Sequence, residues 1–499
     1  MKNNGDSYFL FNRPPHPPAV CEPLLLLLPC GAPPLCGAAS CSSELGLWRE
    51  VKNWVKASVI VEKMRVAIYC HSIAPSIDGV CRRFSAILNE LVRQGHEIIL
   101  FTLEEKPLDI PQELLAVISL DYMFAPAYPD KKIAGLTVRS VSKIWSALRK
   151  YRPSVLHITA DGFSHTFALI GLLLKIPVVG SFHTDLIDLI STHNANFFQK
   201  WCISSKEHLD SYVLDSCATT SQSFAKKLAS QYLVCEHIIL TSVDTETFNP
   251  VKKNDSVRNE LTFGNPQALL CVYVGRISRE KRLDVIVEAV KNVSGVYLAI
   301  IGDGPTAETY TKLHGKQNRI YCKPRFLSHE KLAEIYASSD IHVSASEFET
   351  LGNTVLEAFA CGIPVIVPRT QGFLDTVSHD ENGFLFEPAQ SESAQRYIEM
   401  CKSRRDLVSA MGAAGLQAVA GRTIQCVVQD LLEWYTVGQI KRLHRGHLRA
   451  LIVLLSLLWA VPFTMLCLGG YNSVMYLLAL IYGDSHKERL KKLSVVKTD

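Results

Sequence analysis

The stretch Glu349-Thr-Leu-Gly-Asn-Thr-Val-Leu-Glu357 places two carboxylates on either side of a turn that leads into a helix. A strand-like segment, 340–346, precedes the turn, and an apolar strand, 363–368, follows the helix. This order of strand, turn, helix and strand predicts part of a parallel α/β sheet. Three backbone N–H groups lie at the predicted helix N-terminus, those of Leu351, Gly352 and Asn353. A helix N-terminus binds phosphate groups well, so a diphosphate beside two carboxylates, as in a sugar nucleotide, suits this stretch.

The same alternation extends through both halves of the chain. In the first half, predicted strands cover 65–70, 97–103, 155–159 and 176–183, with a helix over 164–174. In the second half, predicted strands cover 268–275, 296–302, 319–322, 341–344 and 363–367. The polar stretch 252–265 between the halves is interpreted as a hinge. The pattern predicts an α/β protein with two Rossmann-like domains that face one another across a cleft, with ligands at the carboxyl ends of the strands.

The chain divides into four predicted parts. Residues 1–63 are rich in proline and hold a leucine run too short for a membrane span, which indicates a disordered or targeting leader, with a transit peptide as one form of it. Residues 64–250 form the N-terminal Rossmann-like domain, and residues 251–440 form the C-terminal one. Residues 441–499 form a basic-flanked membrane hairpin and tail.

Composition limits the classes of function. The 499 residues are 48% hydrophobic and 20% charged, which is typical of a globular protein. The net charge is only +4, and it comes from residues 441–499, so the sequence predicts no nucleic-acid partner. The 15 cysteines form no Cys-x-x-Cys pair or zinc-type cluster, so we expect them to be reduced and mostly buried.

The apolar stretch 450–483 contains no charged residue over its 34 positions. One helical span needs about 20 residues, so the stretch is long for one helix and short for two. Lysine and arginine residues flank it on both sides, which favours a hairpin or re-entrant element with both ends on the cytoplasmic side. A buried core hairpin is the alternative.

Three loops place cations, a glycine and a histidine at predicted strand ends. Gly275-Arg276-Ile-Ser-Arg-Glu-Lys281 follows a strand, so Arg276 and Lys281 offset a leaving diphosphate, whereas a solvated helix start is the alternative. Gly79 stands at a helix N-terminus, where the backbone approaches a phosphate closely. His183 ends a buried strand and points into the cleft, although a structural histidine is the alternative.

The order of these motifs resembles glycosyltransferase family 4. Gly275-Arg276 with Lys281, then Gly302-Asp-Gly-Pro305, then Glu349 to Glu357 follow that family's pattern, and the likeness extends from about residue 64 to residue 435. The resemblance implies the GT-B architecture and hexosyl transfer with retention of anomeric configuration, by same-face attack in which the leaving phosphate helps to accept the proton. It implies no metal and no cofactor besides the nucleotide-sugar co-substrate, and the sequence has no Asp-x-Asp metal motif.

The resemblance also implies a role for each matched residue. The first domain binds the acceptor and the second binds the donor. Arg276 and Lys281 hold the donor diphosphate, and Glu357 bonds the nucleotide ribose. Glu349 faces the transferred sugar and His183 lies near the reacting carbon, so these two are the predicted catalytic residues. Four further positions complete the phosphate site: Leu351, Gly352, Asn353 and Gly79.

The sequence also departs from the family pattern. Thr241-Ser-Val-Asp244 stands where Asn-Gly-Val-Asp is usual, and Thr370-Gln-Gly372 stands where two consecutive glycines are common. Asp375 occupies a position often held by glutamate. Within the family, residues 182–184, 243–250 and 346–352 are most similar to the sulfolipid synthases, which transfer sulfoquinovose from UDP to diacylglycerol.

The resulting hypothesis is a retaining, metal-independent hexosyltransferase that acts on a membrane lipid such as diacylglycerol, with a UDP-sugar or similar donor that includes sulfoquinovose. It implies a plastid membrane for a sulfolipid synthase and otherwise the cytosolic face of an endomembrane. One alternative is transfer to a soluble glycan or a dolichol-linked acceptor. Another is a catalytically silent membrane scaffold with the same fold.

Overall fold

The computed structural model describes residues 63–444 except 77, 126–127, 136, 161–162, 186, 189–203, 205–206, 208, 211, 232 and 325–326. The predicted leader and the predicted membrane hairpin therefore lie outside the described residues. None of the helices in the described part combines the length and the apolar composition that a membrane span requires.

The first half of the described chain is built on a seven-stranded parallel sheet. Its strands are β1 (Arg65–Cys70), β2 (Glu97–Thr102), β3 (Ala116–Ser119), β6 (Val155–Thr159), β7 (Val178–Phe182), β8 (Ser216–Thr219) and β9 (His237–Ile238). They lie in the order β3-β2-β1-β6-β7-β8-β9. The helices of this half are α3 (Gly79–Arg93), α4 (Val138–Tyr151), α5 (Ser164–Leu174) and α8 (Gln222–Ser230), and β4 (Tyr122–Ala125) pairs with β5 (Tyr128–Ala134) as an antiparallel hairpin.

The second half is built on a six-stranded parallel sheet. Its strands are β10 (Leu269–Val274), β11 (Val296–Ile301), β12 (Ile320–Cys322), β13 (Ile341–Val343), β14 (Val365–Pro368) and β15 (Gly383–Phe386), in the order β12-β11-β10-β13-β14-β15. The α-helices are α9 (Asp255–Leu261), α10 (Leu283–Lys291), α11 (Ala307–Thr311), α12 (His329–Ala337), α13 (Asn353–Ala360), α14 (Phe373–Thr376), α15 (Ser391–Ser403), α16 (Arg405–Val419) and α17 (Ile424–His444). Two 3₁₀ turns, η1 (Pro250–Lys252) and η2 (Arg279–Lys281), complete the list.

Both sheets are buried on two faces, which explains their continuous apolar strands. In β1, Ala67 and Tyr69 belong to the core on one face, and Val66 and Ile68 belong to the core on the other. The strands of the second sheet divide between two cores in the same way. The predicted pair of parallel α/β sheets is therefore confirmed. Most of the described cysteines are buried, as expected.

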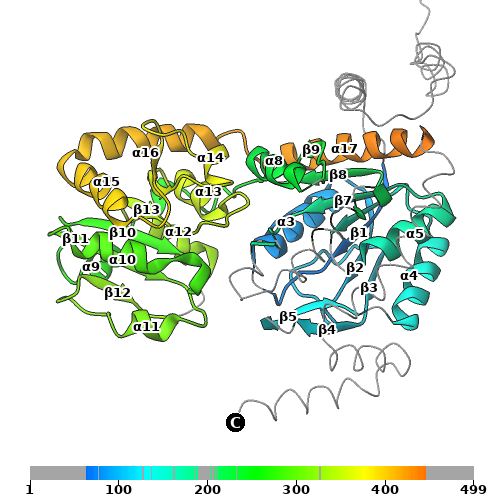
Figure 1. Ribbon diagram of the computed structural model, residues 1–499, viewed down its shortest axis with the longest axis horizontal. Coiled ribbons are helices and arrows are strands. Elements are labelled where there is room, and N and C mark those ends of the chain that lie inside the picture. The colour runs from blue at the N-terminus through cyan, green and yellow to red at the C-terminus, as the bar shows by residue number, and fades with distance from the viewer. Residues whose placement is uncertain are drawn as a thin grey trace, which may run out of the picture. The chain divides into compact units, whose positions relative to one another are not determined.

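The last described helix returns to the first sheet. Figure 1 shows α17, in orange, beside β8 and β9, and α17 packs against α3 and β6 as well. Its Val427, Leu431 and Trp434 lie in the same apolar core as β1. The predicted domain boundaries stay a prediction, but this helix, although assigned by sequence mostly to the second domain, contributes to the core of the first half.

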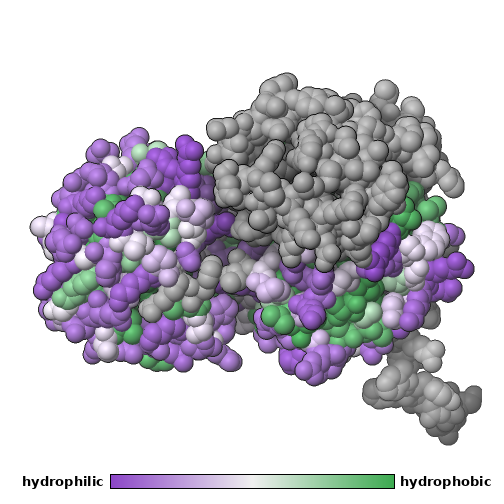
Figure 2. All heavy atoms as spheres, turned by 90° about the horizontal axis from the view of Figure 1, so that it is seen from below, coloured by the Kyte–Doolittle hydropathy of each residue, from purple (hydrophilic) through white to green (hydrophobic). Residues whose placement is uncertain are grey.

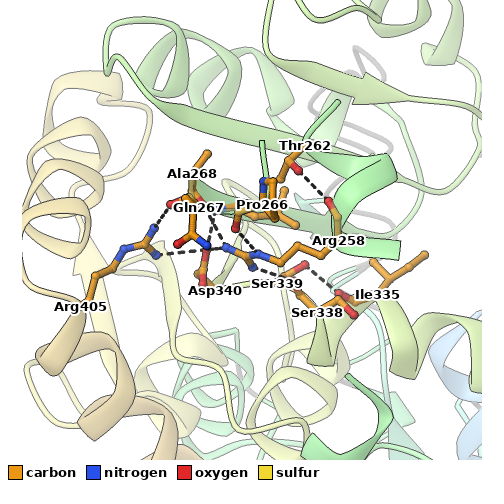
Figure 3. A network of polar contacts seen from close by, with 11 residues as sticks. Arg258, Thr262, Pro266, Gln267, Ala268, Ile335, Ser338, Ser339, Asp340 and Arg405 are labelled. Atoms are coloured by element: carbon orange, nitrogen blue, oxygen red, sulfur yellow. Dashed lines mark hydrogen bonds and ion pairs between the residues drawn. The ribbon is translucent and has the colours of Figure 1, made fainter. Parts of the chain in front are cut away.

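The polar stretch 252–265, interpreted from the sequence as a hinge, is partly helical. Half of it folds as α9, whose N-cap Asn254 accepts hydrogen bonds from two backbone N–H groups of the helix. Arg258 on α9 donates to the carbonyls of Pro266, Ser338 and Ala268 and to the Asp340 carboxylate at 2.8 Å, as Figure 3 shows. This network attaches α9 to the start of the second sheet and gives the polar side chain of Arg258 a structural role, while the hinge stays a prediction.

Candidate active site

The predicted site residues lie at the carboxyl ends of strands where each sheet reverses its strand order. In the first sheet this point lies between β1 and β6, and in the second it lies between β10 and β13. Arg276 follows β10, Glu349 follows β13, and His183 follows β7 next to β6. Ligands of doubly wound sheets bind at such points, so the topology supports the candidate site.

Lys281 and Glu349 form an ion pair. Lys281 ends η2 after β10, and its Nζ contacts Glu349 Oε1 and lies 3.5 Å from Ser346 Oγ. Burial acts to raise the pKa of Glu349, but the Lys281 ammonium outweighs it and holds the pKa below its ordinary value. The structure therefore brings together a predicted diphosphate ligand and a predicted sugar ligand, with Glu349 ionised.

Glu357 lies on α13 and is only 6% exposed. Its Oε1 accepts a hydrogen bond from Arg82 Nη1 at 3.0 Å, and its Oε2 accepts one from Tyr336 Oη at 3.1 Å. Burial raises the pKa of Glu357, and the Arg82 guanidinium opposes that rise only in part. Because Arg82 belongs to α3, this pair joins the helix after β1 to the helix after β13.

The predicted phosphate turn has the required shape. Gly352, with φ +85°, precedes the first residue of α13 and provides no side-chain cap for the helix N–H groups. A Cβ at Gly352 would lie 2.7 Å from the Phe373 ring, so both the backbone and the packing require glycine here. Gly79 begins α3, and a Cβ there would lie 2.8 Å from Asn353 Nδ2. Two helix N-termini thus meet at Gly79 and Asn353, while Leu351 is buried beside them.

Arg276 lies in the loop after β10, at a partly exposed position. Its carbonyl accepts a hydrogen bond from Tyr273 Oη at 2.7 Å, which fixes the loop backbone. The loop also depends on glycine: Gly302 has φ +141°, and a Cβ there would lie 1.9 Å from the Gly275 carbonyl oxygen. The Gly-Asp-Gly-Pro motif therefore allows β10 and β11 to end in close contact.

His183 is held on both ring nitrogens. Arg83 Nη1 lies 3.0 Å from its Nδ1, and Ser181 Oγ lies 2.7 Å from its Nε2. An arginine only donates, so Nδ1 must accept and the proton must lie on Nε2. Burial, together with the charge of Arg83, holds the pKa of His183 well below its ordinary value. The ring is therefore neutral and both its nitrogens are engaged, while its carbonyl accepts from Thr350 Oγ1 at 3.0 Å.

A chain of hydrogen bonds continues from His183 to α17. Ser181 Oγ lies 2.8 Å from His157 Nε2, and His157 Nδ1 lies 2.8 Å from Tyr435 Oη. Ser181 accepts from His183, so it donates to His157, whose own proton then faces Tyr435. Burial lowers the pKa of His157 to about 3, so this histidine is neutral as well. The last described helix thereby supports the orientation of the predicted catalytic histidine.

The buried neutral histidine makes folding sensitive to acid. The pKa of His157 is about 3 in the folded state, against 6.5 for an ordinary histidine. The unfolded chain binds the proton first. We therefore expect His157 to lower the free energy of unfolding as the pH falls from 6.5 towards 3, with a contribution of about 2 kcal/mol at pH 5. Urea unfolding at pH 7 and pH 5 measures this loss, and His157→Gln should reduce it. The partly exposed His379, changed to glutamine, is the control, and an equal reduction in both variants contradicts the assignment.

The sequence analysis did not select several residues that contact the predicted site residues. Arg82, Arg83, Tyr336, Ser181 and Thr350 each bond a predicted site residue. Arg82 and Arg83 follow the predicted glycine turn at Gly79, and that proximity was the one available signal. Within the described residues, no group of three His, Cys, Asp or Glu side chains could hold a metal ion. The predicted absence of a metal and a cofactor stays a prediction.

The chain is a glycosyltransferase of the GT-B type. Residues 77–247 match the model of Glycosyltransferase Family 4, and residues 258–417 match that of Glycosyl transferases group 1. HepE of Anabaena in complex with UDP has the same fold, with a TM-score of 0.61 at 16% identity, over 75% of this chain and 100% of that one. The resemblance to family 4 is confirmed, and these matches favour an enzyme over a silent scaffold.

The relatives differ in the substrates that their names state. Sulfoquinovosyl transferase SQD2 of Arabidopsis thaliana is 28% identical over 70% of this chain and 69% of its own length. GDP-mannose-dependent alpha-mannosyltransferase of Corynebacterium glutamicum is 25% identical over 75% of this chain and 89% of its own. Alpha-monoglucosyldiacylglycerol synthase of Streptococcus pneumoniae is 26% identical over 65% of this chain and 75% of its own.

Proposed function

We propose that the protein transfers a hexose from a nucleotide-diphosphate sugar to the hydroxyl group of a membrane lipid such as diacylglycerol, with retention of configuration. The observation that carries the proposal is the Lys281–Glu349 ion pair beside the N-terminus of α13. Lys281 offers a cation to a diphosphate, and the N-terminus of α13 offers it backbone N–H groups. Glu349 offers a carboxylate to the hydroxyl groups of a sugar. Glu357 adds a buried carboxylate for the ribose.

His183 does not accept a proton in the proposed reaction, because Arg83 and Ser181 engage its two ring nitrogens. Its role is to position the sugar through a fixed backbone and ring. The acceptor's proton then passes to the departing phosphate, whose charge Lys281 and Arg276 stabilise in the transition state. Such a reaction needs no metal in the site.

A lipid acceptor is favoured by two kinds of observation. One of the relatives described above, alpha-monoglucosyldiacylglycerol synthase, is named for the synthesis of a glycolipid. On the protein, α4 exposes Val138 at 75% together with Arg139, Arg149 and Lys150, a combination typical of helices at membrane surfaces. Figure 2 shows hydrophobic residues gathered in patches on one face of a mostly hydrophilic surface. The uncharged stretch 450–483 supports membrane attachment.

Mannosyl transfer is the second candidate. The GDP-mannose-dependent alpha-mannosyltransferases of Corynebacterium glutamicum and Mycobacterium tuberculosis align over 89% and 98% of their own length, a larger share than that of sulfoquinovosyl transferase. The two candidates share the diphosphate and ribose contacts and differ in base and sugar.

One experiment tests the proposal. Full-length protein in detergent is incubated with diacylglycerol and, in turn, UDP-glucose, UDP-sulfoquinovose and GDP-mannose, and the lipid products are identified by mass spectrometry and their anomeric configuration by NMR. A glycolipid from one donor supports the proposal. Parallel incubations use a dolichol-linked glycan and soluble glycans as acceptors, and transfer to these alone contradicts an acceptor of the diacylglycerol type. An inverted product contradicts retention.

A further inference from the structure

Arg83 is a buried cation that has no acidic partner in the part of the chain that the structure describes. It lies on α3 and is 9% exposed. Among the described residues, no carboxylate forms an ion pair with it. Burial lowers the pKa of Arg83 to about 10, which leaves it charged at neutral pH. Buried charges are costly unless they are paired, so this one calls for an explanation.

The partners of Arg83 are neutral. Nη1 donates to His183 Nδ1 at 3.0 Å, and Nη2 donates to Thr241 Oγ1. The Nε–H is buried and has no hydrogen-bond partner. His183 cannot be the counter-charge, since its ring is neutral. The guanidinium therefore keeps its full positive charge and an unused donor.

The neighbouring cations, unlike Arg83, form ion pairs with carboxylates. Arg82, the preceding residue, pairs with Glu357, and Lys281 pairs with Glu349. Each of them is neutralised by a carboxylate before any ligand binds. Arg83 thus offers an uncompensated charge, and a bound anion would remove the cost of burying it.

Arg83 is also close to the predicted sugar position. It donates to His183, and the His183 carbonyl accepts from Thr350 Oγ1 at 3.0 Å. Thr350 directly follows Glu349, the carboxylate assigned to the transferred sugar. Lys281, assigned to the diphosphate, contacts Glu349 itself, so the sugar and diphosphate positions are adjacent. The direct contact of Arg83 is with His183, the residue assigned to the reacting carbon of the sugar, and this places its charge at the sugar end of the donor.

We infer that Arg83 binds an acidic group, a sulfonate or a carboxylate, on the transferred sugar. This inference rests on the proposed function and narrows it to donors whose sugar is anionic. A guanidinium suits the task because its planar N–H groups match the oxygens of such groups and it is more weakly hydrated than an ammonium. The Nε–H and the Nη2 that now contacts Thr241 would supply the hydrogen bonds.

The test compares four probes by calorimetry on the full-length protein: UDP, UDP-glucose, UDP-glucuronic acid and UDP-sulfoquinovose. Wild-type protein is expected to bind at least one acidic-sugar donor about 10- to 100-fold more tightly than UDP-glucose. Arg83→Gln should abolish that preference and leave UDP affinity within about twofold. Arg83→Lys should keep part of the preference, because the charge remains while the planar N–H arrangement is lost. The acid preferred by wild type distinguishes a sulfonate from a carboxylate.

Arg93→Gln is the matched control, since Arg93 lies on the same helix, is exposed and pairs with Glu90. It should retain the wild-type preference. Equal wild-type affinity for UDP-glucose and both acidic donors overturns the inference and leaves the proposed function standing. A parallel loss of UDP affinity in Arg83→Gln also overturns it, because the arginine then serves the diphosphate. If Arg83→Gln does not fold, as judged by its thermal transition, Arg83→Lys becomes the deciding variant. A full wild-type preference for the acidic-sugar donor in Arg83→Lys, with unchanged UDP affinity, contradicts recognition by the planar N–H groups of Arg83. If wild type binds none of the four probes, the inference fails, and the proposed function fails with it only if GDP and GDP-mannose do not bind either.

Discussion

Replacing Lys281 by alanine is expected to lower kcat/KM for sugar transfer by about 10²–10³-fold. The Lys281 and Glu349 side chains are 22% and 26% exposed, so their pair lies in a partly desolvated position. A cation there stabilises the charge on a departing diphosphate more strongly than it would in water. Because that charge develops in the transition state, kcat should fall together with kcat/KM, and initial rates over a range of donor concentrations measure both.

Two further variants show whether the effect belongs to the site. Lys331→Ala removes a similar lysine that pairs with Glu334 at 2.7 Å on α12, and it should keep wild-type turnover. Lys281→Arg keeps the charge and should recover part of the lost rate. Wild-type turnover of Lys281→Ala would remove Lys281 from the mechanism and leave the Glu349 contact as a purely structural ion pair.

Much of the fold was predictable because the buried strands have strong local signals. The predicted bounds of β1, β6 and α5 agree with the structure, since long apolar runs between turn residues leave few alternatives. The short strands β8, β9 and β15 were missed, whereas the equally short β12, β13 and β14 were predicted from the alternation of strands and helices around them. The return of α17 to the first sheet was missed for another reason. Its apolar residues do not lie on one clear face, and nothing local identifies which sheet it covers.

The sequence predicts the candidate site as a set of residues but not the contacts among them, and the roles of these residues stay a prediction. Lys281 and Glu349 were each proposed as donor ligands, yet their direct pairing depends on how the ends of β10 and β13 approach one another. Arg82 and Glu357 are 275 positions apart, and no local pattern links them. The histidine at 183 was correctly located at a strand end, while its neutral, doubly bonded ring follows from Arg83, which sequence reasoning did not select.

Replacing Glu357 by alanine is expected to raise the KM for the donor by about 100-fold. The carboxylate is buried and already oriented by Arg82 and Tyr336, so it binds a ribose hydroxyl without first losing conformational freedom. Removing one partner from a buried polar contact costs several kcal/mol, which corresponds to an effect of this size. Calorimetry with UDP and GDP measures the loss directly. Glu334→Ala, which removes a partly exposed carboxylate on α12, should bind both nucleotides as wild type does.

The same substitution should change stability much less than binding. Burial raises the pKa of Glu357, so ionising this carboxylate is less favourable in the folded state than in the unfolded chain and costs folding free energy at neutral pH. Its removal relieves that cost. Tyr336 Oη loses its acceptor, whereas Arg82, whose side chain is 36% exposed, can turn to water, so the net change should stay within about 1 kcal/mol. The raised pKa also predicts that donor affinity declines as the pH falls through it, because protonation removes the charge that the ribose contact uses. A large drop in the urea midpoint with unchanged nucleotide affinity would instead mean that Glu357 serves the packing of α13 and α3, and that the ribose is held elsewhere.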